Sequence, residues 1–154
     1  MKKFQIQLLV MVSALALGSS VLARGNFTAH LNDDENVPAF ASPTDAQGQF
    51  NAHRSGNDSL RYTLNVTNLP NVVASHIHCG PAGDAGPVGV TLFVGGPVST
   101  NGMLAHGEIL APDFVNGCGW DTLDDVIDAL ESGDTYINIH TLQSFPGEIR
   151  GQVN

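Results

Sequence analysis

Apolar and polar residues alternate with a period of two along most of the chain. The clearest case is the segment 60–67, in which every second residue is apolar, beginning with Leu60 and Tyr62. Such alternation is typical of a β-strand with one buried face and one face in water. It predicts an all-β sandwich or small barrel built from short strands. We expect eight strands, over residues 26–31, 49–53, 60–67, 72–78, 88–93, 103–110, 135–141 and 148–153.

One segment departs from this pattern and predicts a short amphipathic helix over residues 121–133. Asp121 is the expected N-cap and Gly133 the expected C-terminal stop. Two segments rich in Gly and Pro, 80–89 and 95–102, are expected to be loops. The apolar residues of the helix recur at i, i+3, i+4 and i+7, and they are Leu123, Val126, Ile127 and Leu130.

Charge and composition exclude several classes of protein. Charged residues make up only 14% of the chain and there are 17 glycines, which excludes a coiled coil, while 42% apolar residues argue against disorder. With 15 acidic and 6 basic residues, the formal net charge is −9. Such a chain, without a basic run, repels phosphates, so we expect no nucleic-acid partner. The sequence also lacks glycine motifs for nucleotides and a serine-nucleophile elbow.

The N-terminus has the pattern of a secretory signal peptide. Two lysines precede an apolar segment over residues 8–17, and small residues follow up to Ala23. The apolar segment is far shorter than the roughly 20 residues that cross a bilayer. We therefore expect a signal peptide over residues 1–23, cleaved after Ala23, and a secreted or periplasmic domain over residues 24–154 that does not bind membranes.

The domain that remains after cleavage would be strongly acidic. It has four arginines, no lysine and all 15 acidic residues, so its formal net charge is 4 − 15 = −11, which favours cations as ligands. Both cysteines of the chain, Cys79 and Cys118, lie in this domain. Because an exported protein folds in an oxidising compartment, we expect a disulfide between them.

Three histidines are the candidate metal ligands. His76 and His78 are two residues apart in an expected strand, so their side chains leave the same face about 6.6 Å apart. In the strand 135–141, Ile137 marks the buried face, which places His140 on the outer one. If the two strands are neighbours, the three imidazoles converge on the outer surface of the sheet. Neutral imidazoles suit copper or zinc.

Two other interpretations of the histidines remain open. An H-x-H pair in a strand can also be two polar residues on a wet face. His30, His53 and His106 lie alone in other strand segments, where surface or hydrogen-bonding roles are expected, and one of them could supply a fourth ligand.

Several segments together resemble the CHRD domain, a family named from its repeats in chordin and also found as single exported domains in bacteria. The similarity covers most of residues 27–152. The segments that carry it are Phe27-Thr28-Ala29-His30-Leu31, Glu35-Asn36-Val37-Pro38, Gly48 to Phe50, Leu60-Arg61-Tyr62-Thr63-Leu64, Ser75-His76-Ile77-His78-Cys79-Gly80, Gly86-Pro87-Val88, Tyr136-Ile137-Asn138-Ile139-His140-Thr141 and Pro146-Gly147-Glu148-Ile149-Arg150-Gly151-Gln152.

The resemblance implies an immunoglobulin-like, Greek-key β-sandwich or barrel. It also implies a distant similarity to copper/zinc superoxide dismutases, which hold copper through an H-x-H pair on the outside of a β-barrel. On that comparison His76, His78 and His140 are copper ligands and Arg150 is the cation that attracts superoxide. The segment 80–89 lacks the bridging histidine and zinc ligands of those enzymes, so the comparison supports copper alone.

Three polar residues near these histidines have simpler interpretations. Glu148 and Arg150 share a strand face, so an exposed structural ion pair, or edge-strand charges that prevent aggregation, explain them without an anion-guiding role. Asn138 shares its face with His140 and is expected to orient that ring by a hydrogen bond.

These observations support two functional hypotheses. The first is an exported domain that binds a transition metal, with copper favoured, at His76, His78 and His140, and that has superoxide dismutase-like redox activity. The second is a metal-free extracellular module that binds or adheres to another protein, as the presence of the domain in the secreted signalling antagonist chordin suggests. They differ in geometry, because only the first requires the three imidazoles to share a common point.

Overall fold

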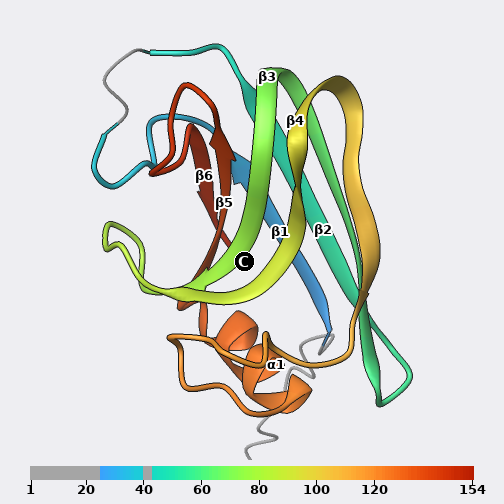
Figure 1. Cartoon of the computed structure of the whole chain (residues 1–154). Helices are drawn as coiled ribbons and strands as arrows, with labels where there is room; N and C mark the ends of the chain where they lie inside the picture. The colour runs from blue at the N-terminus through green and yellow to red at the C-terminus, as the bar shows by residue number, and fades with distance from the viewer. Residues whose placement is uncertain (1–24, 40–42) are drawn as a thin grey trace, which may run out of the picture.

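The computed structural model of the protein describes residues 25–39 and 43–154 (Figure 1). The expected signal peptide, residues 1–23, lies outside the described residues. In the described part, six strands and one short helix confirm the all-β prediction. In chain order they are β1 (Asn26–Leu31), β2 (Gln47–Ser55), β3 (Ser59–Cys79), β4 (Val88–Ile109), α1 (Leu123–Ser132), β5 (Thr135–Thr141) and β6 (Ile149–Gln152).

The sheet is an antiparallel barrel that is nearly closed. Its strands follow the order β1-β2-β3-β5-β6, and β4 pairs with β3 outside this path. β1 and the C-terminal end of the chain also meet, because Asn32 and Arg150 exchange backbone hydrogen bonds of 2.8 and 3.0 Å. Thr28 and Asn154 do the same, with bonds of 2.9 and 3.0 Å. These bonds join the first strand to the last.

Two of the strands each cover two strands that the sequence predicts. The expected strands 60–67 and 72–78 are one strand, β3, and the expected strands 88–93 and 103–110 are both parts of β4, which also includes the predicted loop 95–102. The prediction of eight strands is therefore wrong. Figure 1 shows β3 and β4 as a long, curved pair that bends over the rest of the barrel.

The turn-like sequence between the two halves of β3 does not interrupt its pairing with β4. Asn68 and Asn71 have a φ of 56°, a left-handed conformation that asparagine tolerates better than most residues. Their backbone N–H groups donate to side chains of β4, to Asn101 Oδ1 at 2.8 Å and to Ser99 Oγ at 2.9 Å. These side-chain acceptors replace missing backbone partners, so the pairing continues past the bulges.

The barrel interior is filled by the apolar residues of the alternating pattern. In β1, for example, Phe27, Ala29 and Leu31 are buried while the residues between them are exposed. Burying such side chains stabilises the fold by about 25 cal/mol per Å² of apolar surface removed from water. The inner faces of β3 and β5 contribute Leu64 and Ile137 to the same core. The side chains on the outer face of the sheet do not fill this core, so they are available for other roles.

Helix α1 lies at one end of the barrel (Figure 1), as the sequence predicts, but it begins one residue later than expected. Thr122, and not Asp121, is the N-cap: its side chain accepts from Asp125 N while the Asp125 carboxylate accepts from Thr122 N. A threonine is preferred here because the two side chains satisfy backbone donors reciprocally. Gly133 ends the helix with a φ of 77°. No helix in the described ranges is long and apolar enough to cross a membrane.

A disulfide joins the end of β3 to the segment before α1. Cys79 and Cys118 are bonded, with Cα atoms 5.8 Å apart. The loop that follows Cys79, residues 80–87, returns along the strand ends, and Cys79 N donates to Pro87 O at 3.2 Å. This disulfide and the adjoining hydrogen bonds hold the loop 80–87 against the outer face of β3 and β5.

Candidate metal centre

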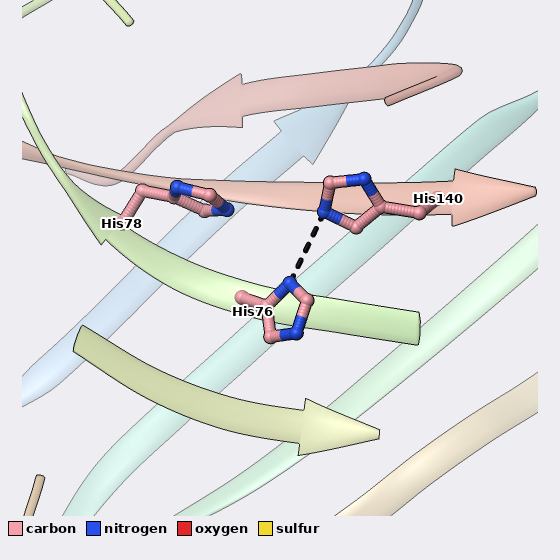
Figure 2. A group of neighbouring side chains, drawn as sticks. All are labelled: His76, His78 and His140. Carbon is pink, nitrogen blue, oxygen red and sulfur yellow. Dashed lines mark hydrogen bonds between the residues drawn. The ribbon is translucent and has the colours of Figure 1, made fainter. Parts of the chain in front are cut away.

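The three candidate ligands lie on two paired strands. β3 and β5 are antiparallel neighbours, and in their register His78 faces Tyr136 and His76 faces Asn138. His140 is two residues beyond Asn138, so it lies diagonally from His76 on the same outer face, within the reach of ring side chains. The condition set by the sequence, that the two strands be neighbours, is met. Figure 2 shows the three rings turned toward a common point.

One nitrogen from each ring lies within 4.8 Å of the others. His76 Nδ1 is 3.1 Å from His140 Nε2, a hydrogen-bond distance drawn in Figure 2. Nitrogens around a tetrahedral zinc or copper ion are roughly 3.3 Å apart, since each lies about 2.0 Å from the metal. The rings are therefore close enough to share one ion after small inward rotations.

Backbone carbonyl groups determine which nitrogen of His78 and His140 carries the proton. His78 Nδ1 lies 2.9 Å from Gly86 O, and His140 Nδ1 lies 2.7 Å from Phe145 O. A carbonyl oxygen only accepts hydrogen bonds, so both rings must be protonated at Nδ1. In the neutral rings the lone pair is then on Nε2, the atom that faces the cluster. His76 donates from Nδ1 to His140 Nε2.

One of these lone pairs has no partner. His78 is 7% exposed, and its Nε2 atom is buried without a hydrogen bond to any described residue. Buried polar atoms are nearly always satisfied, and an exception calls for an explanation such as a bound ion. The unpaired acceptor faces the other two histidines. The donor set and this unpaired atom fit a metal that prefers imidazole.

The environment keeps the three rings neutral. The pKa of His76 is lowered to about 4, mainly by burial and in addition by the charges that His140 and His78 would carry, while the Asp113 carboxylate acts in the opposite direction. Burial is also the main cause of the lowered pKa of His78 and of His140, and in both the carbonyl hydrogen bond opposes it. Neutral imidazole is the form that coordinates metals. The three rings are therefore uncharged at neutral pH.

The other histidines do not join the cluster. His30 lies on β1, His53 on β2 and His106 on β4, and none belongs to the group of converging ligands found among the described residues. No protein side chain is thus assigned as a fourth ligand. His76 and His140 are partly exposed, so one side of the cluster faces solvent.

The charged residues proposed near the site are arranged differently from the sequence interpretation. Glu148 and Arg150 are 5% and 2% exposed, and they form no ion pair with each other. Glu148 accepts a hydrogen bond from Thr141 Oγ1, whereas the Arg150 guanidinium lies 3.5 Å from the centre of the Tyr136 ring. The interpretation as an exposed ion pair is wrong because loops cover this end of the sheet. The Arg150 side chain is likewise buried and not an exposed surface cation.

Asn138 does not orient His140 as expected. Its Nδ2 group donates to Pro146 O at 3.0 Å, and His140 Nδ1 donates instead to the carbonyl oxygen of the neighbouring Phe145. The sequence interpretation also missed Gly86, whose carbonyl has the same role for His78. These acceptors are main-chain atoms, so no residue type identifies them. The alternation in the strand 135–141 places Tyr136 on the same outer face as the histidines, and this pattern could have predicted its contact with the His78 ring.

A nearly closed antiparallel barrel with a three-histidine cluster on its outer face defines an all-β domain with a candidate metal centre. The family model of the CHRD domain matches residues 27–153, nearly the whole chain. The protein therefore belongs to the CHRD domain family. No curated protein and no solved structure matches it.

Proposed function

We propose that this protein is an exported CHRD-domain protein that binds one transition-metal ion, with copper favoured, at His76, His78 and His140. His78 and His140 would bind through Nε2 and His76 through Nδ1, the three atoms that already face one another. Binding would replace the hydrogen bond between His76 Nδ1 and His140 Nε2, and His76 would then carry its proton on Nε2. The other two rings keep the tautomers that the carbonyl groups select.

The observation that carries the proposal is the buried, unpaired His78 Nε2 atom. If the three histidines were only polar surface residues, this acceptor would be in contact with water or with a donor. Instead it lies beneath the loop 80–87 and faces two further imidazoles, one of which uses its own lone pair in a hydrogen bond. A metal ion at the common point would satisfy all three nitrogens together.

Copper is favoured by the ligand set, and the protein charge favours a cation of either metal. Imidazole nitrogens without a thiolate or carboxylate suit copper and zinc, and copper binds such sites more tightly. The formal net charge of −9 attracts a cation. Bound copper with an open position would supply one-electron chemistry of the kind used in superoxide dismutation. The protein would supply neutral ligands, a partly exposed side and a fixed ring geometry.

Metal titration tests the proposal. The purified protein is titrated with Cu(II) and with Zn(II) by calorimetry, and the bound metal is measured by elemental analysis. The test variant is His76→Ala/His78→Ala, and the matched control is His53→Ala/His106→Ala, which removes two histidines from the same sheet outside the cluster. We expect one tight equivalent of copper in the wild type and in the control, and its loss in the test variant.

Equal weak uptake by all three proteins would contradict the metal site. A tight equivalent that survives in the test variant would place the metal elsewhere. If the site is confirmed, a superoxide assay of the copper-loaded protein then decides whether it has dismutase-like activity.

Export is part of the proposal. It is supported by the signal-like sequence of residues 1–23 and by the Cys79–Cys118 disulfide, which is typical of an oxidising compartment. N-terminal sequencing of the protein from its host would locate the cleavage, expected after Ala23. An intact N-terminus in the cell extract would contradict export.

A second candidate function is a metal-free module that binds another extracellular protein. The observation that favours it is the fully exposed Phe114 side chain beside Val115, which is 85% exposed. Exposed apolar residues of this size are typical of interaction surfaces when they are grouped. A negative metal titration would leave this as the better candidate.

A further inference from the structure

We infer that Tyr136 is the positioning residue of the metal centre: it fixes the ring plane and the tautomer of His78 by stacking on that ring and by holding the Gly86 carbonyl. The functional meaning of this role rests on the proposed metal-binding function. Its structural basis lies outside the three ligands. It assigns a role to a buried tyrosine that neither the fold nor the ligand set explains.

The first part of the argument is the ring contact. His78 and Tyr136 are direct cross-strand neighbours, and their rings are nearly parallel, with an interplanar angle of 11° and centroids 4.8 Å apart. Tyr136 is 3% exposed, so the phenol ring has no freedom to swing away. The flat contact limits rotation of the imidazole out of its plane. It thereby directs Nε2 toward His76 and His140.

The second part is a pair of hydrogen bonds between the Tyr136 hydroxyl and the backbone of one residue, Gly86. The hydroxyl oxygen accepts from Gly86 N at 2.9 Å and the hydroxyl donates to Gly86 O at 3.1 Å. The same carbonyl oxygen accepts from His78 Nδ1 at 2.9 Å. Tyr136 therefore holds the acceptor that keeps the His78 proton on Nδ1. A displaced carbonyl would allow the proton to occupy Nε2, where it blocks coordination.

The backbone of Gly86 is held close to the end of β3 by other contacts as well. A Cβ atom on residue 86 would lie 1.6 Å from Cys79 O, so the backbone of Gly86 passes directly over the end of β3. Cys79 N in turn donates to Pro87 O. These contacts bring the Gly86 peptide to the strand, and the Tyr136 hydroxyl sets its orientation.

Arg150 supports Tyr136 from the other side. β5 lies between β3 and β6 in the sheet, so His78 and Arg150 contact opposite faces of the Tyr136 ring. The guanidinium lies 3.5 Å from the ring centre, a cation–π contact, and one of its nitrogens donates to Pro81 O at 3.3 Å. This places Arg150 in a supporting role behind the ring and gives its burial a reason.

The test compares Tyr136→Phe with Tyr62→Phe. The first variant keeps the stacked ring and removes the hydroxyl that holds Gly86. The second is a matched control, because Tyr62 is the other tyrosine of the chain and its hydroxyl also donates to a backbone carbonyl, Leu92 O at 2.7 Å, away from the cluster. The ring ¹⁵N chemical shifts of His78 are measured in the metal-free proteins at pH 7.5, and Zn(II) affinity is measured in parallel.

We expect His78 in the wild type and in Tyr62→Phe to be one tautomer, protonated at Nδ1. In Tyr136→Phe we expect a mixture of tautomers and a Zn(II) affinity about 10- to 100-fold lower. An unchanged tautomer in Tyr136→Phe, or a wild-type His78 protonated at Nε2, would overturn the inference. If the variant fails to fold, the wild-type measurement still tests the inference, because a His78 protonated at Nε2 would overturn it.

The two readouts separate this inference from the proposed function. Failure of the wild type to bind metal would refute the metal site, while the tautomer populations of the metal-free proteins would still show whether Tyr136 positions His78. Tight metal binding with equal tautomers in all proteins would support the site and refute the role of Tyr136.

Discussion

At the scale of single residues, the cluster combines three side chains that would repel one another when protonated. Burial disfavours the charged form of each ring, and the His76 pKa is lowered to about 4 by burial together with its two neighbours. As a consequence, the unfolded chain binds protons at these histidines in mild acid, whereas the folded protein does not. In return, all three imidazoles are neutral near pH 7, which is the form that coordinates metals.

This arrangement predicts a loss of stability in mild acid. The unfolded chain protonates histidine near pH 6.5, whereas folded His76 protonates only near pH 4, so the unfolded state binds more protons between these values. The free energy of unfolding of the metal-free protein is therefore highest above about pH 6.5 and decreases as the pH falls toward 4. Urea unfolding at a series of pH values measures this slope.

The variant His76→Gln tests the origin of the slope. Removing one depressed histidine should make the loss of stability between pH 6.5 and 4 smaller than in the wild type. An identical slope in the two proteins would show that His76 does not resist protonation in the folded state.

At the scale of elements, the site depends on how the loop 80–87 is joined to β3. The disulfide between Cys79 and Cys118 closes a chain segment with a sequence separation of 39. Chain-entropy reasoning assigns such a loop a stabilisation of about 4 kcal/mol, an upper figure because measured values are often smaller. The bond also begins the loop that carries the Gly86 carbonyl to His78.

We therefore expect Cys79→Ser/Cys118→Ser to lower the free energy of unfolding by about 2–4 kcal/mol and to weaken metal binding. Urea unfolding with and without a reductant measures the first effect. The reductant should bring the wild type to the stability of the variant and leave the variant unchanged. Equal stability of the oxidised wild type and the variant would refute a stabilising role for the bond.

The elements also show how far the sequence predicts the structure. Alternation identified the buried and outer faces, and the H-x-H spacing with His140 identified the residues that converge. The continuity of β3 was not predictable, because asparagines such as Asn68 and Asn71 are typical of turns. The acceptors that allow the pairing to continue, Asn101 Oδ1 and Ser99 Oγ, lie on the partner strand, far away in the sequence. Likewise, the acceptors for His78 and His140 are backbone carbonyls from loops, which leave no pattern of side chains.

At the scale of the whole molecule, the distribution of charge bears on the proposed chemistry. Arg54 and Arg61 form exposed ion pairs with Asp124 and Glu108, and Arg150 is buried behind Tyr136. None of these three described arginines is a free surface cation beside the histidines, and the formal net charge is −9. The overall field attracts metal cations and repels superoxide. Metal binding is thus better supported by the electrostatics than rapid superoxide capture.

The joining of β1 to the C-terminal end of the chain completes the barrel and holds β6 beside β5. This contact is close because Gly151 has no side chain: a Cβ atom there would lie 2.2 Å from His30 O, a backbone atom of β1. The neighbouring Arg150 exchanges its backbone hydrogen bonds with Asn32 at the same junction. A change that separates β1 from β6 would therefore also move the residue that supports Tyr136.

Gly151→Ala is expected to destabilise the whole barrel. Since a backbone oxygen cannot move aside as a flexible side chain can, the added methyl group should lower the free energy of unfolding by about 1–3 kcal/mol, the usual cost of overpacking. The matched control is Gly96→Ala in β4, where a Cβ atom would meet nothing within 4 Å, and it should change stability by less than about 0.5 kcal/mol. Urea unfolding of the three proteins measures the difference. Equal effects of the two substitutions would mean that β1 and β6 do not approach as closely as the barrel requires, whereas a loss confined to Gly151→Ala would locate the closure of the barrel at this glycine.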